Sequence, residues 1–501
     1  MPNAYQCLGS YVFTDPKGEL YDKTAGYLKS QGYDIKIFNL VKPQNSDGYN
    51  PLMHITSEID VDIIASTIIK GQGEIASAKA DPYWDDMAEM LLKALIYYLM
   101  ATRPEAEQNL SSCAELVRAA NNNSGGNLLT ELMNQLPYDH PARMYYKSIE
   151  IAPEKTYGSI LSSLQSKLGK FDSKEIAELT STDTIDFEKI GSQKTALYVI
   201  SSDTHGAYDF LLTIFFSQMI QQLYDHADNN GGALKQPTYF ILDEFANIGR
   251  IPDFDKKIST SRSRKISFSV ILQNLDQLEA VYEKSHETIM GNCDTHLFLG
   301  SNSQKTVEYF SKALGEKTIS RESVSVNKDR MDWKQGKSVS DQLSGRALLT
   351  PDELRRLDND LCIIYEKGLK PIKAHKDYYF TDRTIVRKLD ELAVSHNNID
   401  PIDRGVWRKY NPYNPYKENS EPKENNKIGS LDDLFEEDTK LNDVKKEKPV
   451  EKTIQKPEII EDNFAPTLPL EEEPEVAKTE LDIQKELEAK FDELFGAFDE
   501  E

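Results

Sequence analysis

The feature that most constrains this chain is the alternation of short apolar runs with helical patterns over about its first 380 residues. The apolar runs predict strands at 11–14, 35–39, 196–201, 238–242, 267–272, 296–299 and 361–365. Most of these runs are continuous, which is typical of parallel strands covered by helices on both faces. Helical patterns such as 207–224 and 304–314 lie between several of them. The alternation predicts an α/β fold with a mainly parallel sheet.

One long stretch interrupts this rhythm. From about residue 55 to residue 190 there is almost no strand pattern, and helices are predicted at 85–101, 113–121, 127–135, 142–151 and 157–170. An all-α domain inserted between two strands of the sheet is the simplest interpretation. We therefore predict an α/β domain formed by 1–54 and 191–395, an inserted all-α domain at 55–190, and a linker with a tail at 396–501.

The tail carries most of the charge. The whole chain has a formal net charge of −24, of which −15 lies in residues 417–501 and −9 in the rest. The tail is also poor in aromatic residues, so we expect it to be disordered. Its two acidic-apolar segments, around Leu434-Phe435 and at 491–498, suit either partner binding or a plain solubility tail. The nearly balanced body excludes a generally basic nucleic-acid coat but not a locally basic channel.

Several classes of protein are excluded by what the sequence does not contain. Its four cysteines (Cys7, Cys113, Cys293 and Cys362) are far apart and form no CxxC pair, so we expect reduced thiols in a cytoplasmic setting. The histidines form no HxxxH or HExxH spacing, which argues against a zinc hydrolase. No apolar run reaches the ~18 residues that a membrane helix needs, and no signal peptide is expected.

The strongest local signal is the segment YFILDEF, in which four apolar residues lead into Asp243 and Glu244. Such a strand delivers two carboxylates to the carboxyl edge of a parallel sheet, where ligands of α/β proteins bind. In nucleotide hydrolases the first acid holds the magnesium shell and the second polarises water. A buried strand that merely runs into an acidic loop is the structural alternative.

Two further segments sharpen this interpretation. The apolar run 266–272 ends in Gln273, whose amide could sense a γ-phosphate or place the attacking water, or could simply cap the next helix. Three cationic residues, Arg262, Arg264 and Lys265, lie within four positions just before that run, in a predicted turn. This turn is either a solvated basic loop or an arginine offered to the nucleotide of a neighbouring subunit.

A third segment, TDPKGE at 14–19, follows the first predicted strand. Pro16 and Gly18 favour a sharp turn at the edge of the sheet. We expect this turn to leave Asp15 and Lys17 displayed there, although the motif alone says little about function.

Together these segments resemble the type IV secretion coupling proteins of the TraG/TraD family, conjugative DNA-transfer ATPases related to hexameric DNA translocases. The resemblance rests on TDPKGE, SDGYNPL, PYW, ILDEFANIG, SRSR and VILQNLDQL in this order, and it covers about residues 10–382. It implies a RecA-like P-loop NTPase core with a mainly parallel sheet, interrupted by an all-α domain.

The resemblance also implies roles for individual residues. Asp243 becomes the Walker B acid that holds Mg²⁺, and Glu244 the catalytic base that acts on ATP. Gln273 matches the sensor glutamine of the family. Arg262 best matches the arginine finger that acts on a neighbouring subunit, with Arg264 as a rival. Asp15 and Lys17 (the turn residues above) are then expected to contact the nucleotide.

One part of the family pattern is not found. A P-loop, GxxxxGKS/T, is expected a few tens of residues before TDPKGE, whereas only nine residues precede Ser10. The membrane helices of the family are not found either. We therefore expect a chain that begins just after its P-loop, binds ATP poorly by itself and hydrolyses little, because the backbone cradle and the lysine for the phosphates are absent.

The function that the resemblance implies is that of a subunit linking the DNA relaxosome to a type IV secretion channel and driving DNA transfer by ATP hydrolysis. The implied partners are DNA bound without sequence specificity, the relaxase and other relaxosome proteins, the channel, and further copies in a homohexamer. The implied location is the cytoplasmic face of the bacterial cell membrane. A non-catalytic receptor that recruits substrates is the alternative. A chromosome-segregation translocase fits the helical insertion less well.

Overall fold

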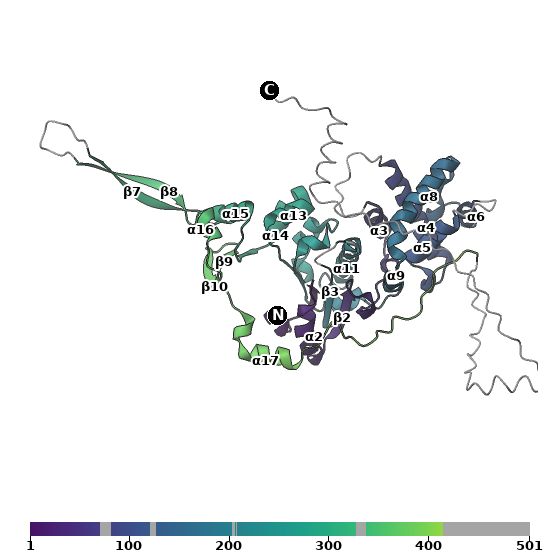
Figure 1. Cartoon of the computed structure of the whole chain (residues 1–501), viewed down its shortest axis with the longest axis horizontal. Coiled ribbons are helices and arrows are strands. Elements are labelled where there is room, and N and C mark those ends of the chain that lie inside the picture. The colour runs from purple at the N-terminus through teal and green to yellow at the C-terminus, as the bar shows by residue number, and fades with distance from the viewer. Residues whose placement is uncertain (71–81, 121–126, 203–205, 207, 327–336, 414–501) are drawn as a thin grey trace, which may run out of the picture. The chain divides into compact units, whose positions relative to one another are not determined.

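Five parallel strands form the central sheet of the protein (Figure 1). The computed structural model describes residues 1–70, 82–120, 127–202, 206, 208–326 and 337–413. The strands are β1 (Ser10–Thr14), β2 (Asp34–Asn39), β3 (Thr195–Ile200), β4 (Thr238–Leu242) and β5 (Ile266–Val270). Their order in the sheet is β2-β3-β1-β4-β5, and every neighbouring pair is parallel. The predicted α/β class with a mainly parallel sheet is confirmed.

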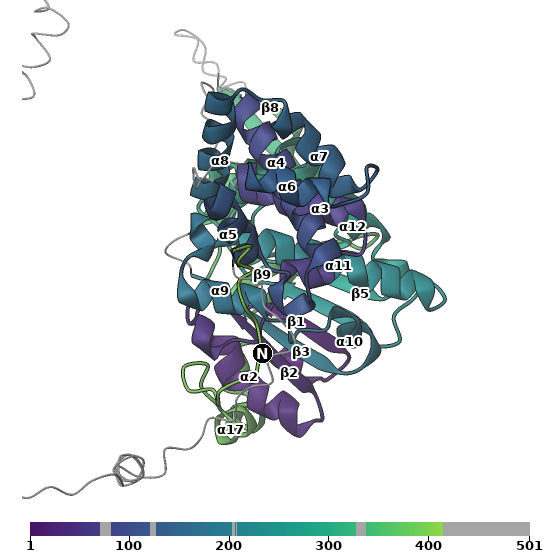
Figure 2. The ribbon, with the colours of Figure 1, turned by 90° about the vertical axis from the view of Figure 1, so that its right-hand side faces the viewer.

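Successive side chains of these strands enter two different cores, because a strand turns alternate residues to opposite faces. On one face, Val12, Leu197 and Phe240 pack with α11 (Asp209–Asn229). On the other, Tyr11 and Tyr198 pack with three helices: α1 (Pro2–Tyr5), α2 (Glu19–Ser30) and α17 (Arg383–Glu391). Figure 2 shows α11 and α2 on opposite sides of the sheet. This double cover explains the continuous apolar runs in β1, β3 and β4.

A group of helices follows β2 and leads back to β3. These are α3 (Glu58–Lys70), α4 (Tyr83–Thr102), α5 (Leu110–Ala120), α6 (Leu128–Asn134), α7 (Pro141–Glu150), α8 (Glu154–Leu168), α9 (Lys174–Ser181) and α10 (Phe187–Ser192). The long helix α4 buries Leu92, Leu95 and Leu99 against its neighbours α3, α5, α7 and α8. The buried residues of these helices form one apolar cluster with α11 and one face of the sheet.

The last two predicted strands do not join the parallel sheet. β6 (Thr295–Phe298), β9 (Leu361–Glu366) and β10 (Ile372–His375) form a separate sheet in the order β10-β9-β6, and both pairs are antiparallel. Its core is completed by α15 (Gln304–Leu314) and α16 (Pro351–Arg355). The apolar run at 361–365 is buried or half-buried, whereas in the run at 296–299 only Phe298 is buried. An apolar run also does not determine the direction of strand pairing.

A two-stranded hairpin was not expected from the sequence. β7 (Glu316–Val326) pairs with β8 (Lys337–Ala347) along its whole length, antiparallel. These segments are rich in charged and hydroxyl residues, so they contain no apolar run that would mark a strand.

Three short α-helices lie between β4 and β6 in the chain: α12 (Phe254–Thr260), α13 (Leu275–Tyr282) and α14 (His286–Asn292).

Residues 396–413, which we call the strap, run along the body and are bonded to it. His396 donates its backbone N–H to Asp22 Oδ1 at 2.6 Å, and Arg404 Nε donates to the Ser46 carbonyl at 2.8 Å. Further along, Arg408 Nε donates to Glu107 at 2.7 Å. The strap, which lies in the stretch predicted as a linker, is thus hydrogen-bonded to the body. The predicted disordered tail and its two acidic-apolar segments lie outside the described residues.

Two expectations from composition can be compared directly with the structure. None of the four cysteines forms a disulfide. In the part of the chain that the structure describes, no helix combines the length and the apolarity needed to span a bilayer.

Candidate active site

The turn after β4 holds two carboxylates in a constrained geometry. Thr14 Oγ1, at the end of β1, donates a hydrogen bond to the Asp243 carbonyl at 2.7 Å, which ties the two strand ends together. The backbone N–H of Glu244 donates to Asp243 Oδ1 at 3.1 Å. Glu244 itself has φ +49°, a left-handed conformation that is rare for a residue with a side chain. Both acids are half-buried.

The Glu244 carboxylate has two amide partners. Asn247 Nδ2 donates to Oε2 at 2.8 Å, and Gln273 Nε2 lies 3.5 Å from Oε1, at the outer limit of a hydrogen bond. The turns themselves are joined, because the Phe245 N–H donates to the Ile271 carbonyl at 3.1 Å. Asp243, Glu244 and Gln273 therefore gather at the carboxyl edge of the sheet, and we call these residues with Asn247 the carboxyl-edge site.

Asn247 was not singled out from the sequence. Its position three residues after Glu244, in the 3₁₀ turn Phe245–Ile248, brings its side chain back onto the carboxylate. A polar residue three positions after a strand-end acid is the only signal that the sequence offered. The Asn247 amide contacts one oxygen of the Glu244 carboxylate and the Gln273 amide contacts the other, which orients the carboxylate. The Gln273 side chain remains exposed to solvent.

The expectation that Asp15 is displayed at the edge is wrong. Asp15 is only 3% exposed, and its Oδ2 accepts a hydrogen bond from the Tyr21 N–H at 2.7 Å, at the start of α2. Burial raises the pKa of the Asp15 carboxyl above its ordinary value. Gly18 completes this turn with φ +73°. Lys17, at the tip of the same turn, is exposed.

The structure separates the two candidate fingers. Arg264 forms a two-pronged ion pair with Asp228, with Nε to Oδ1 and Nη2 to Oδ2 both at 2.8 Å, and it lies 4.7 Å above the ring of Tyr224. Arg262 is exposed and makes no ion pair with any described residue. Arg262 and Arg264 precede β5, whereas Gln273 follows it. The length of this strand, about 17 Å, therefore separates the two arginines from the carboxyl-edge site. Arg262 is therefore not brought to the site of its own chain.

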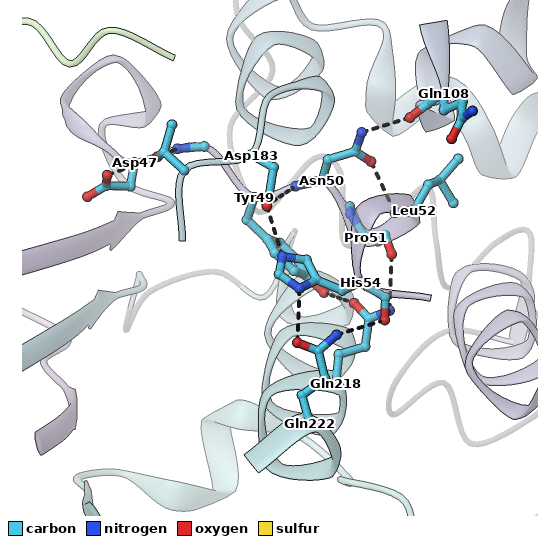
Figure 3. A network of polar contacts seen from close by, with 12 residues as sticks. Asp47, Tyr49, Asn50, Pro51, Leu52, His54, Gln108, Asp183, Gln218 and Gln222 are labelled. Carbon is cyan, nitrogen blue, oxygen red and sulfur yellow. Dashed lines mark hydrogen bonds and ion pairs between the residues drawn. The ribbon is translucent and has the colours of Figure 1, made fainter. Parts of the chain in front are cut away.

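The SDGYNPL segment builds a junction between the sheet and the inserted helices (Figure 3). Asp47 accepts a hydrogen bond from the Ile37 N–H at 3.0 Å, and Thr184 Oγ1 donates to Asp47 Oδ1 at 2.9 Å. Asn50 donates through its backbone N–H to Asp183 Oδ1 at 3.2 Å and through its side chain to the Gln108 carbonyl at 2.7 Å. The segment that leaves the sheet is thus bonded to the segment that returns to it.

Helix α11 completes the junction with two glutamines. The fully buried Tyr49 donates its hydroxyl to Gln218 Oε1, and Gln218 Nε2 donates to the Pro51 carbonyl at 3.0 Å. The ring of His54 lies between Asp183 Oδ1 at 2.9 Å and Gln222 Oε1 at 3.3 Å. Nothing in the sequence singled out Asp183, Gln218 or Gln222, because they are more than a hundred residues away from the segment they hold.

The donors at the carboxyl-edge site suit one metal in particular. Mg²⁺ is usually held by one or two carboxylates together with substrate phosphates and water, so it does not need a cage of protein ligands. Asp243 keeps one carboxylate oxygen free of the hydrogen bond from Glu244. The described residues contain no group of three or more His, Cys, Asp or Glu side chains that could hold a metal alone. The site therefore fits Mg²⁺ bound with a phosphate ligand and does not fit structural zinc.

Comparison with known proteins identifies the family. Residues 1–400 match the family described as type IV secretory system conjugative DNA transfer. The chain belongs to that family. The match covers the central sheet, the inserted helices and the second sheet, and it confirms the resemblance drawn from the sequence motifs.

Curated relatives of the family agree with this. VirD4 of Rhizobium radiobacter is 25% identical over 408 residues, which are 77% of this chain and 55% of that protein. Conjugal transfer protein TraG of Escherichia coli is 25% identical over 416 residues, with coverage of 76% and 65%. The chain thus spans only part of the length of these relatives, about half in the case of VirD4.

Solved structures of the bacterial conjugative coupling protein TrwB are also similar. An unbound form lacking the first segment of TrwB has a TM-score of 0.49 and 15% identity, covering 75% of this chain and 86% of that one. A TrwB complex with ADP and Mg²⁺ has a TM-score of 0.47 and 16% identity, with the same 75% and 86% coverage. At this level of similarity the fold assignment rests on the chain's own sheet and on the family match.

Proposed function

We propose that this chain is the motor portion of a conjugative coupling protein, which uses ATP hydrolysis to move DNA toward a type IV secretion channel. The observation that carries the proposal is the carboxyl-edge site, where two carboxylates and an amide from neighbouring parallel strands meet. Parallel α/β sheets bind their ligands at this edge. Family membership makes DNA transfer the process in which such a site would act.

Each side chain has a chemical task in this proposal. Asp243 holds Mg²⁺, and Glu244 orients the attacking water and accepts its proton. Asn247 keeps the Glu244 carboxylate in place, and the exposed Gln273 amide contacts the terminal phosphate. Bound Mg²⁺–ATP supplies the phosphoryl group and the positive charge that offsets the charge on its oxygens. Lys17, at the tip of its turn, remains a predicted nucleotide contact, as does Asp15 despite its burial.

Arg262 acts on a neighbouring subunit in this proposal. It is exposed and lies at the end of β5 remote from its own site, so only another copy can receive it. This requires an oligomer, for which we propose a homohexamer around DNA at the cytoplasmic face of the cell membrane. The relaxase and relaxosome proteins are the proposed suppliers of the DNA.

The test is a mating assay in the bacterium that carries the gene. Glu244→Gln should lower conjugative DNA transfer by at least about 100-fold, the lower range for loss of a general base, while the amount of protein stays unchanged. Glu287→Gln is the matched control, because Glu287 is an exposed acid on α14. Transfer by the Glu244→Gln protein at the rate of the Glu287→Gln protein would refute the proposal.

A further inference from the structure

Gln273, the exposed amide of the carboxyl-edge site, is held more firmly through its backbone than through its side chain. Its side chain reaches Glu244 Oε1 only at 3.5 Å, the outer limit of a hydrogen bond. Its backbone N–H, in contrast, donates to Oε1 of the Gln277 side chain at 3.1 Å. The position of Gln273 between β5 and α13 therefore depends on a residue one helical turn further along the chain.

The first turn of α13 shows how Gln277 comes to make this bond. Asn274 is the N-cap of the helix, and its Oδ1 accepts the N–H of Gln277 at 3.1 Å. In a standard capping box, the side chain of this third helical residue returns a bond to the N–H of the cap itself. Here the Gln277 side chain bonds one residue earlier, to the N–H of Gln273. The same helical turn therefore forms the cap and fixes the residue before it.

This arrangement leaves the Gln273 side chain without a capping role. The sequence alone allowed Gln273 to be the cap of the next helix, whereas the structure assigns the cap to Asn274. The Gln273 side chain is exposed, and its amide lies next to the Glu244 carboxylate. Groups that contact a ligand work best when neighbouring residues hold them by hydrogen bonds. Gln277 is the residue that supplies such a bond to Gln273.

Helix α13 is itself anchored to a neighbouring helix. The Leu275 N–H donates to Thr306 Oγ1 at 3.1 Å, and Thr306 is buried. Ser303 Oγ donates to Asp276 Oδ2 at 2.6 Å. Ser303 is the N-cap of α15 and Thr306 lies in its first turn, so the first turns of the two helices hold each other. Gln277 therefore supports Gln273 from a helix end that is fixed at two points.

We propose that Gln277 is a positioning residue of the carboxyl-edge site. Its side-chain oxygen holds the Gln273 backbone so that the Gln273 amide reaches the terminal phosphate. This inference rests on the proposed function, because Gln277 has a task only if Gln273 contacts a phosphate. Gln277 does not touch the ligand itself and acts only through Gln273. Such indirect effects are large, because a misplacement of about 1 Å can lower a rate about 100-fold.

A purely structural role for Gln277 makes a different prediction. A glutamine that only stabilises the start of a helix would have the same effect whatever residue stands at position 273. A positioning residue instead loses its effect on transfer once the side chain that it positions is removed. A double-mutant cycle on Gln273 and Gln277 therefore separates the two roles.

The test is a mating assay of this cycle in the bacterium that carries the gene. Gln277→Met keeps the length of the side chain without its acceptor, and it should lower transfer about tenfold. Gln277→Glu keeps an acceptor and should transfer DNA at close to the native rate. Gln273→Ala should lower transfer at least as much as Gln277→Met, and the double variant no further than Gln273→Ala. Gln221→Met is the matched control, because Gln221 on α11 also bonds through its side chain to a residue four positions away, Asp225.

Hydrogen exchange of the purified 501-residue chain tests the bond itself without nucleotide or DNA. In the Gln277→Met chain the amide of Gln273 should exchange about fivefold faster, because its acceptor is lost. The amide of residue 277, which is bonded to Asn274, should keep its protection. Circular dichroism of each variant establishes that it folds.

Four results would overturn the proposal. The Gln277→Met protein could transfer DNA at the rate of the Gln221→Met control, or the Gln277→Glu protein could be as defective as Gln277→Met. The double variant could fall a further tenfold or so below Gln273→Ala, or the exchange of the Gln273 amide could be unchanged. Normal transfer by Gln273→Ala would also end this inference, whereas the proposed motor function would still be decided by Glu244→Gln.

Discussion

Glu244 combines a left-handed backbone with a carboxylate fixed by Asn247, and this combination has a cost in stability. A non-glycine residue at φ +49° is strained by about 1 kcal/mol. We therefore expect Glu244→Gly to have a higher free energy of unfolding than Glu244→Ala, by up to about 1 kcal/mol, while neither supports DNA transfer. Urea unfolding of the two variants measures the difference. Equal stabilities would show that the turn is unstrained.

The buried Asp15 carboxyl makes a second prediction at this scale. Its raised pKa means that the folded state holds the proton more tightly than the unfolded state, so stability declines as pH rises from the ordinary Asp value through the raised one. Asp15→Asn keeps an acceptor for the Tyr21 N–H without a charge, and it should lack this decline. Asp15→Ala also lacks the charge but loses the acceptor, so it should be less stable than Asp15→Asn by about 1 kcal/mol at every pH.

Urea unfolding between pH 4 and pH 8 measures all three proteins. The expected order at pH 8 is Asp15→Asn at least as stable as the native chain and more stable than Asp15→Ala. A parallel pH dependence for the native chain and the Asn variant would contradict the assignment of the decline to Asp15.

At the scale of elements, the junction of Figure 3 attaches the inserted helices to the sheet and to α11. Tyr49→Phe removes one hydroxyl from a fully buried ring and leaves the buried Gln218 Oε1 without its donor. The free energy of unfolding should fall by about 1–3 kcal/mol, because an unsatisfied buried acceptor loses its hydration without replacement. Tyr138→Phe is the control, since Tyr138 is 70% exposed. A loss no larger than that of the control would mean that the junction does not depend on this bond.

At the scale of the whole molecule, we proposed an oligomer in which Arg262 of one subunit acts at the nucleotide site of another. Such an oligomer predicts complementation between two chains that are each inactive alone. Glu244→Gln and Arg262→Ala should each abolish transfer alone. Expressed together, they should restore part of it, because an interface between the two can join an intact Glu244 with an intact Arg262. Mating assays of single and paired strains measure this. No recovery in the paired strain would contradict action between subunits.

Arg264→Ala should behave differently from Arg262→Ala. Loss of its ion pair with Asp228 should lower the free energy of unfolding by about 0.5–1 kcal/mol, the usual contribution of a partly exposed pair. Arg262→Ala should leave stability unchanged, because the side chain is exposed. Chemical unfolding separates the two, and equal destabilisation would contradict the distinction that the structure draws between them.

Local sequence determined the element types and the composition of the carboxyl-edge site. Residues 238–242 were predicted as a strand and form β4 with the same bounds, because a continuous apolar run between polar residues reports burial directly. Asp243 and Gln273 follow neighbouring parallel strands, so their gathering at one edge follows from strand direction alone. The family was likewise evident from the order of motifs.

The tertiary structure alone decided which distant groups meet. It turned Asp15 inward onto α2, paired Arg264 with Asp228, and set β6 and β9 antiparallel in a second sheet. No strand in the described part of the chain pairs with the outer edge of β5 or of β6, whereas Asp47 hydrogen-bonds to the outer edge of β2. The physical reason is that periodicity and propensity describe a residue's own segment, whereas hydrogen bonds between segments depend on how the whole chain closes on itself.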